Sequence, residues 1–90
     1  MDDRLIFDFT RLEPGRLYLF LPGGSVSGGL WGVFERYDRR QGVLLAVCSG
    51  DLRRFEMWTM LPSGYLSCRA ASEAESETFS AELERKLAAV

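Results

Sequence analysis

The side chains best suited to chemistry in this chain are arginines that gather near two expected turns. The larger cluster comprises Arg36, Arg39 and Arg40. The smaller cluster is the pair Arg53 and Arg54. A guanidinium makes bidentate contacts with phosphate groups, so these clusters indicate contact with an anionic ligand such as RNA. The competing interpretation is a solvated turn in which Glu35 and Asp38 pair with the larger cluster.

Residues for catalysis and metal binding are sparse. The chain contains no histidine, which removes the usual base near neutral pH and leaves Cys48 and Cys68 without a partner to activate them. Two cysteines are too few for a zinc site, so we expect plain reduced thiols on strands. Asp51 and Glu56 are a carboxylate pair typical of a surface. We therefore expect no enzymatic activity, no metal and no cofactor.

Two further features could bind phosphates or bases. The glycine-rich segment 22–29 lacks the Gly-Lys-Ser/Thr ending of a Walker loop, so we interpret it as a flexible connection. The aromatic residues are numerous enough for base stacking, although at strand positions such residues are more often core or interface anchors. They are Trp31, Tyr37, Trp58 and Tyr65.

Length and charge restrict the class of protein. Ninety residues form one small domain, and a modest core favours packing against a partner or a second copy. The net charge of −2 and the pI near 5.1 argue against a general DNA coat protein. Residues 70–90 are acidic, whereas residues 1–69 are nearly neutral. No apolar run is long enough for a membrane helix and no signal-peptide core follows Met1, so we expect a cytoplasmic (or virion-interior) protein.

Glycine and proline divide the chain into short runs rich in aromatic and branched residues. The expected strands are 16–21, 30–38, 43–48, 53–61 and 65–70. Short connections between such runs are typical of an antiparallel meander or a small barrel. The sequence therefore predicts a mainly β fold, a small five-stranded antiparallel barrel with a C-terminal α-helix. We divide it into an N-terminal arm (1–15), the barrel (16–70) and a helical segment (71–90).

The last segment predicts an amphipathic helix from about 72 to 89. Ser72 and Glu75 have the spacing of a capping box, and glutamates fill the early turns while cations lie near the end. The apolar stripe comprises Phe79, Leu83, Leu87 and Val90. The stripe is narrow, so we expect the helix to lie on the barrel surface or on a neighbour. Residues 5–9 are consistent with a strand or a short helical turn, and we favour an irregular arm or an added strand.

Several strands are apolar on both faces, as in segments 17–21 and 55–61. An isolated barrel should alternate apolar and polar residues, so the outer face must also be covered, by a helix or, as we favour, by another subunit. We expect the strands at 53–61 and 65–70 to be sheet edges that pair with neighbouring subunits. The candidate subunit interface comprises Phe55, Met57, Trp58, Met60, Tyr65 and Leu66.

The segment from Gly32 to Leu45 carries a recognisable order of residue types. A glycine and an apolar residue are followed by two free positions, an apolar residue, Asp38, a short turn and the apolar run 43–45. This order resembles the first signature motif of the Sm/LSm-like (Hfq-type) family of small β-barrels. The resemblance covers roughly residues 16–69, and it implies a homo-oligomeric ring that binds RNA or scaffolds RNA–protein assemblies.

The resemblance also implies roles for single residues. Gly32 would let the long second strand bend, and Asp38 would order the turn that supports the ligand loop. Phe34 and Tyr37 would point inward or toward the ring contact. In the second family motif, an arginine-glycine turn, this chain has Ser63-Gly64, so the glycine is present and the arginine is not.

The RNA-contacting positions of the family are altered here. The base-contacting asparagine falls at Gly42, and the chain contains no asparagine. The base-stacking position falls at Arg40, whose guanidinium can also stack on a base. The candidate nucleic-acid site comprises Arg36, Tyr37, Asp38, Arg39, Arg40 and Gly42.

A second function remains open at this point. The acidic charge and the apolar outer faces are also consistent with a non-enzymatic interaction or structural β-barrel that binds no nucleic acid, for example a phage or accessory assembly component. The expected partners are therefore the chain itself and, in the first interpretation, RNA. We expect neither a membrane nor a DNA-coating role.

Overall fold

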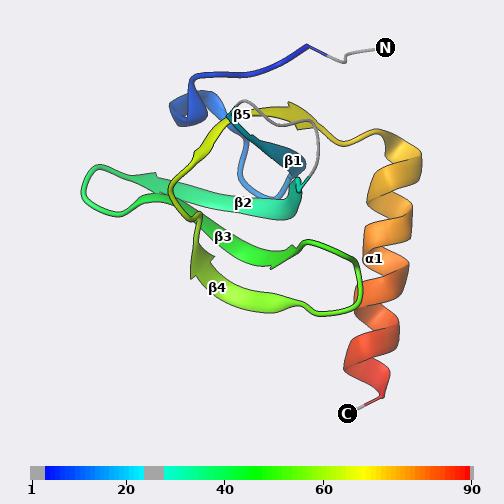
Figure 1. Cartoon of the computed structure of the whole chain (residues 1–90). Helices are drawn as coiled ribbons and strands as arrows, with labels where there is room; N and C mark the ends of the chain where they lie inside the picture. Colours follow the sequence, from blue (N-terminus) through cyan, green and yellow to red (C-terminus); the bar gives the residue numbers. More distant parts are fainter. Residues whose placement is uncertain (1–3, 24–27, 90) are drawn as a thin grey trace.

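The computed structural model describes residues 4–23 and 28–89, and Figure 1 shows one five-stranded antiparallel sheet followed by a C-terminal helix. The elements are η1 (Phe9–Arg11), β1 (Leu17–Pro22), β2 (Leu30–Asp38), β3 (Gly42–Ser49), β4 (Glu56–Met60), β5 (Tyr65–Ala70) and α1 (Glu73–Ala88). The spatial order of the strands is β4-β3-β2-β1-β5. The predicted mainly β fold with a C-terminal helix is confirmed.

Parts of three predictions lie outside the described residues. These are the first three residues of the arm, residues 24–27 of the glycine-rich connection, and Val90 at the end of the apolar stripe.

The fourth strand begins later than we predicted. It starts at Glu56, whereas the sequence suggested residue 53. The Asp51 carboxylate accepts hydrogen bonds from the backbone N–H groups of Arg53 (2.9 Å) and Arg54 (3.1 Å). These bonds close a turn, so the two arginines belong to the β3–β4 connection and not to a strand.

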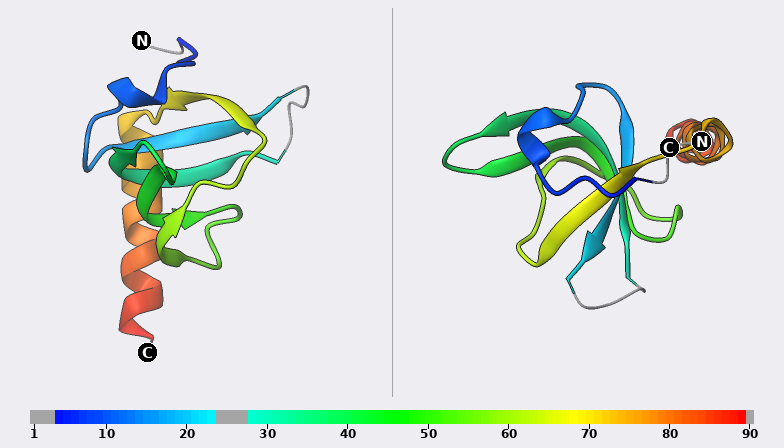
Figure 2. Two further views of the ribbon diagram at one scale, coloured as in Figure 1. Left: turned by 90° about the vertical axis from the view of Figure 1, so that its left-hand side faces the viewer. Right: turned by 90° about the horizontal axis from the view of Figure 1, so that it is seen from above.

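The sheet curls around its inner face, as the view from above in Figure 2 shows. The pairing of β2 with β3 shifts register twice, at Val33/Phe34 and between Phe34 and Arg36. Each shift is a bulge, which bends a strand and increases its twist. Gly32 lies beside the first shift, and a Cβ added there would be 2.8 Å from Leu45 Cδ1. The glycine therefore allows the close approach that the bend requires.

The curled sheet encloses an inner core. Its buried members are Leu12, Tyr18, Phe20, Phe34, Val43, Leu45, Cys48 and Cys68. Phe20, Leu45 and Cys68 are fully buried. No buried side-chain nitrogen or oxygen atom among the described residues is without a hydrogen-bond partner. The inner core is thus built from apolar side chains, and the buried polar side-chain atoms of the described residues are hydrogen-bonded.

A second cluster on the outer face explains why several strands are apolar on both sides. Leu17 and Val47 pack there with Phe79 of α1, and Phe55 meets Phe79 edge-on with ring centroids 5.4 Å apart. Our expectation that another subunit covers the outer face is therefore wrong for these residues. The chain's own helix covers them, with Phe79 buried and Leu87 exposed.

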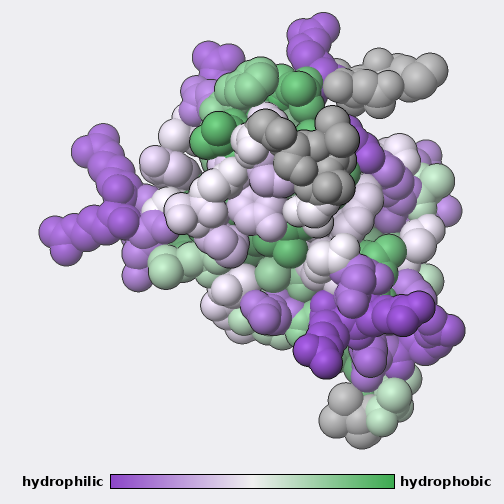
Figure 3. All heavy atoms as spheres, in the orientation of Figure 1, coloured by the Kyte–Doolittle hydropathy of each residue, from purple (hydrophilic) through white to green (hydrophobic). Residues whose placement is uncertain are grey.

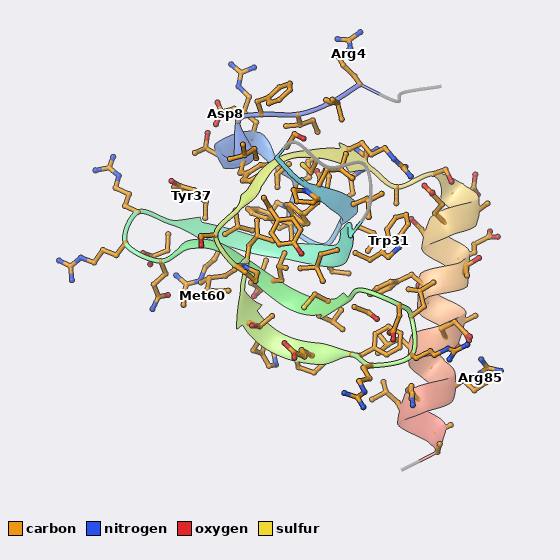
Figure 4. The ribbon with its side chains drawn as sticks, in the orientation of Figure 1. Arg4, Asp8, Trp31, Tyr37, Met60 and Arg85 are labelled. Carbon is orange, nitrogen blue, oxygen red and sulfur yellow. The ribbon has the colours of Figure 1, made fainter. Side chains whose placement is uncertain are left out.

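The start of α1 is fixed to the sheet by an ion pair. Ser72 caps the helix, and Ser72 and Glu75 exchange the two hydrogen bonds of a capping box, as predicted. The Glu75 carboxylate also accepts two hydrogen bonds from the Arg69 guanidinium of β5, at 2.8 and 2.9 Å. Arg69 lies 5.6 Å from the ring centre of Trp31 on β2. These contacts join β5, β2 and α1 (Figure 4).

The N-terminal arm crosses one edge of the sheet. Ile6 and Cys68 form an isolated antiparallel bridge, with Ile6 N–H donating to Cys68 O (2.6 Å) and Cys68 N–H to Ile6 O (2.9 Å). Phe9 then packs edge-on against Phe20, and Leu12 is buried in the inner core. The arm therefore combines a short added strand with a 3-10 turn, η1.

Gly32→Ala should destabilise the fold by about 1–3 kcal/mol, because the new methyl group overpacks the contact with Leu45 and Phe20. Urea unfolding followed by circular dichroism measures the free energy of unfolding. Gly50→Ala is the matched control, since a Cβ there meets nothing within 4 Å. Equal stability of the two variants would contradict the packing argument.

Glu75→Gln should remove an acid-sensitive part of the stability. Hydrogen bonds from Arg69 and from the Ser72 backbone lower the pKa of Glu75 from 4.5 to about 2. A pKa lowered by folding stabilises the protein above pH 4.5, and this contribution is lost as the pH falls toward 2. With discounting for solvent screening we expect about 1–2 kcal/mol.

Unfolding titrations between pH 2 and pH 7 measure this effect, with the glutamine variant showing the shallower pH profile. Glu73→Gln is the control, because Glu73 occupies the same first turn of the helix. Parallel pH profiles for the parent and Glu75→Gln proteins would contradict the assignment of this acid-sensitive stability to Glu75.

Candidate functional site

The turn between β2 and β3 projects from the side of the sheet opposite α1 (Figure 1). The Asp38 carboxylate accepts hydrogen bonds from the backbone N–H groups of Arg40 (2.7 Å) and Gln41 (3.0 Å). These bonds lower the pKa of Asp38. Gly42 completes the turn with φ of +83°, a conformation that favours glycine. Asp38 thus orders the turn, as the resemblance implied.

The cations of this turn differ in their surroundings. Arg36 lies 3.9 Å from the Asp38 carboxylate, which is a long contact between an exposed arginine and a partly buried aspartate. The side chains of Arg39 and Arg40 are exposed, and neither makes an ion pair with another described residue. Tyr37 is 44% exposed beside them. The interpretation in which an acidic neighbour pairs with the cluster therefore applies to Arg36. It does not apply to Arg39 and Arg40.

The two arginine clusters are not brought together. Arg39 and Arg40 precede β3, whereas Arg53 and Arg54 follow it, so the clusters lie at opposite ends of this strand. In the surface view of Figure 3, hydrophilic side chains extend from the β2–β3 turn and gather again over the lower part of α1. Any ligand that contacts both clusters must span the length of β3.

Arg53 and Arg54 line a groove of about 450 Å³ between the β3–β4 connection and the end of α1. The other side chains of this groove are Phe55, Glu56, Met57, Leu83, Lys86 and Leu87. The sequence did not predict this groove, because the groove depends on where the helix packs. The only signal was the presence of cations near the C-terminal end of an amphipathic helix.

The β4 edge exposes large apolar side chains. Met57, Trp58 and Met60 are all about half exposed or more, with Trp58 at 70%. Leu61 N–H donates to Val43 O, and alternate residues of an antiparallel strand bond to the same neighbour. The backbone groups of Glu56, Trp58 and Met60 therefore face away from β3.

The other residues of the predicted interface are arranged differently. Leu66 on β5 is 63% exposed, but Tyr65 packs against the inner core. Phe55 precedes β4 and contacts Phe79 within the chain. The surface that remains available for a neighbour thus comprises Met57, Trp58 and Met60 at one edge and Leu66 at the other.

The backbone of Trp58 is unusual. Its φ is +53°, which lies in the left-handed region that side chains other than glycine rarely adopt. A bulky residue in this conformation costs roughly 1–2 kcal/mol. Strain of this kind is often associated with function, and here it coincides with the most exposed aromatic residue of the sheet edge.

The thiols lie in surroundings that suppress reactivity. Cys48 and Cys68 are both free and buried on strands, as predicted. Burial raises the pKa of the Cys68 thiol to about 12 and also raises that of Cys48. Within residues 4–23 and 28–89, no group of three or more histidine, cysteine or acidic side chains could hold a metal ion.

None of the described helices is long and apolar enough to cross a membrane. The chain matches no protein-family model, no curated protein and no solved structure at the level at which similarity is significant.

Asp38→Ala should loosen the β2–β3 turn, because the backbone N–H groups of Arg40 and Gln41 both lose their acceptor. We expect faster amide hydrogen exchange at these two residues, measured by NMR. The rest of β3 should keep its protection. Asp51→Ala is the control, since it removes an equivalent acceptor in the β3–β4 connection. Unchanged exchange in the β2–β3 turn would contradict the role of Asp38.

Proposed function

We propose that this chain forms a homo-oligomeric Sm-like ring through its two sheet edges and presents the β2–β3 turns to RNA. The observation that carries the proposal is the strand order β4-β3-β2-β1-β5, with apolar side chains exposed at both ends. Edge strands can offer unpaired backbone groups to another chain, and here β4 does so directly while the Ile6 bridge occupies Cys68 on β5. Pairing of β4 in one copy with β5 in the next would bury them.

The two edges are different surfaces, and this favours a ring over a two-fold dimer. A contact between different surfaces is head-to-tail, and it generates a closed ring when the rotation between copies closes. A domain of ninety residues has a small core, so burial of exposed side chains such as Trp58 and Met60 between copies adds substantially to its stability.

The RNA part of the proposal rests on Arg39 and Arg40. Their backbone is ordered by Asp38, and their guanidinium groups make no ion pair within the described chain. An ordered turn backbone reduces the conformational entropy that is lost when these arginines bind phosphates or stack on bases. One turn offers few contacts on a protein with net charge −2, so we expect useful affinity only when a ring repeats the turn.

A second function is supported by the groove beside α1. Its apolar side chains, including Met57 and Leu87, are suited to a protein partner more than to RNA. An interaction or structural β-protein without nucleic-acid binding would use this groove and the β4 edge. The two functions differ in their dependence on salt and on Arg39 and Arg40.

Native mass spectrometry tests the assembly. We expect a closed ring of about five to seven copies, and disruption by Trp58→Glu at one edge or Leu66→Glu at the other, because each places a charge in the contact. Leu87→Glu is the control, since Leu87 is equally exposed but lies on α1. A monomeric parent protein would overturn the ring.

Fluorescence anisotropy with short U-rich and A-rich RNAs tests the ligand. The double variant Arg39→Ala/Arg40→Ala should weaken binding about tenfold or more and reduce its salt dependence. Arg53→Ala/Arg54→Ala changes the charge equally at the other end of β3 and serves as the matched control. If no binding were detected at tens of micromolar protein in low salt, the RNA proposal would fail. The interaction protein without nucleic-acid binding would then be the favoured function.

A further inference from the structure

The outer edge of β5 is occupied within the chain, and this bears on how copies could associate. Cys68 lies in the middle of β5 and exchanges both of its outward hydrogen bonds with Ile6 of the arm. By the alternation of an antiparallel strand, the backbone groups of Ala70 also face outward, whereas a register shift between Leu21 and Pro22 interrupts the alternation at Leu66. The central position of this edge is therefore already paired.

The β4 edge differs in this respect. Among the described residues, no segment forms a strand pair with the outward side of β4. A neighbour can pair with β4 of a single chain directly, but it meets the arm when it approaches β5. In the view from above in Figure 2, the arm crosses β5 near the end of the strand.

The arm occupies the β5 edge through few contacts, so another strand can replace it there. Ile6 packs against the inner core, yet its neighbours Leu5 and Phe7 are exposed, Phe7 at 71%. Within the described part of the arm, from residue 4 onward, only one residue pair bridges to β5. The stronger anchors, Phe9 and Leu12, lie further along the chain and contact the core without occupying the strand edge.

We propose that residues 5–8 are a built-in strand that covers the β5 edge of the single chain and must be displaced before β4 of a second copy pairs there. This inference rests on the proposed self-association. The arm then sets the concentration at which copies assemble, and it protects the β5 edge until a specific partner strand replaces it. Phe9 and Leu12 keep the released segment close to its site.

A disulfide that locks the arm tests the inference. Ile6 and Cys68 are directly opposite in a hydrogen-bonded antiparallel pair, and such pairs have Cα atoms about 5.5 Å apart. This separation is within the range of a disulfide. The variant Ile6→Cys therefore allows a bond to the native Cys68, verified by peptide mapping. Its reduced form is the matched control with the same sequence.

A second variant weakens the arm. Ile6→Pro removes the N–H that donates to Cys68 O, whereas Leu5→Pro alters a neighbouring residue that lies outside the bridge. Loss of the bridge should allow assembly at about tenfold lower concentration. Circular dichroism and urea unfolding verify that each variant is folded before the comparison is made.

Analytical ultracentrifugation distinguishes failure of the arm inference from failure of the proposed self-association. We expect oxidised Ile6→Cys to stay monomeric while its reduced form assembles, and Ile6→Pro to assemble more readily than the parent or Leu5→Pro. Equal assembly of the oxidised and reduced forms would overturn the arm inference alone. Monomers in every sample, the proline variant included, would overturn the proposed self-association and the inference with it.

Discussion

The structure depends on one constraint, which is that a five-stranded sheet of short strands must bend tightly enough to enclose its own core. Gly32 and the two bulges between β2 and β3 make this bend possible. Bending in turn separates the apolar residues into an inner core and an outer cluster under α1. It also leaves β4 and β5 as two different edges and directs the β2–β3 turn away from the helix.

Features that depend on local chemistry could be predicted from the sequence. The capping box of Ser72 and Glu75, the turn at Asp38 and the five strand-like runs all depend on residues a few positions apart. The start of β4 was predicted three residues early, because an apolar pattern does not reveal that the Asp51 carboxylate captures two backbone N–H groups. A side chain that accepts hydrogen bonds from nearby backbone N–H groups competes with strand pairing for those groups.

Long-range contacts explain the remaining features of the structure that the sequence did not predict. The sequence indicated that the outer face needs a cover, but whether α1 or another subunit provides it depends on tertiary packing of Phe79. For the candidate site, the exposed Arg39 and Arg40 follow from turn chemistry alone. The contact between Phe55 and Phe79 and the bridge between Ile6 and Cys68 join residues more than twenty positions apart, and periodicity carries no information on such pairs.

The left-handed backbone of Trp58 has a consequence for how crowded copies of the chain behave. Fibril-forming strands need a continuous run of extended residues with evenly spaced donors and acceptors. Trp58 interrupts that run in the middle of β4, so an arbitrary strand finds only short stretches to pair with on either side. A partner whose own backbone matches the interruption is not excluded in this way. The left-handed residue thus makes this apolar edge a poorer template for a regular extended strand.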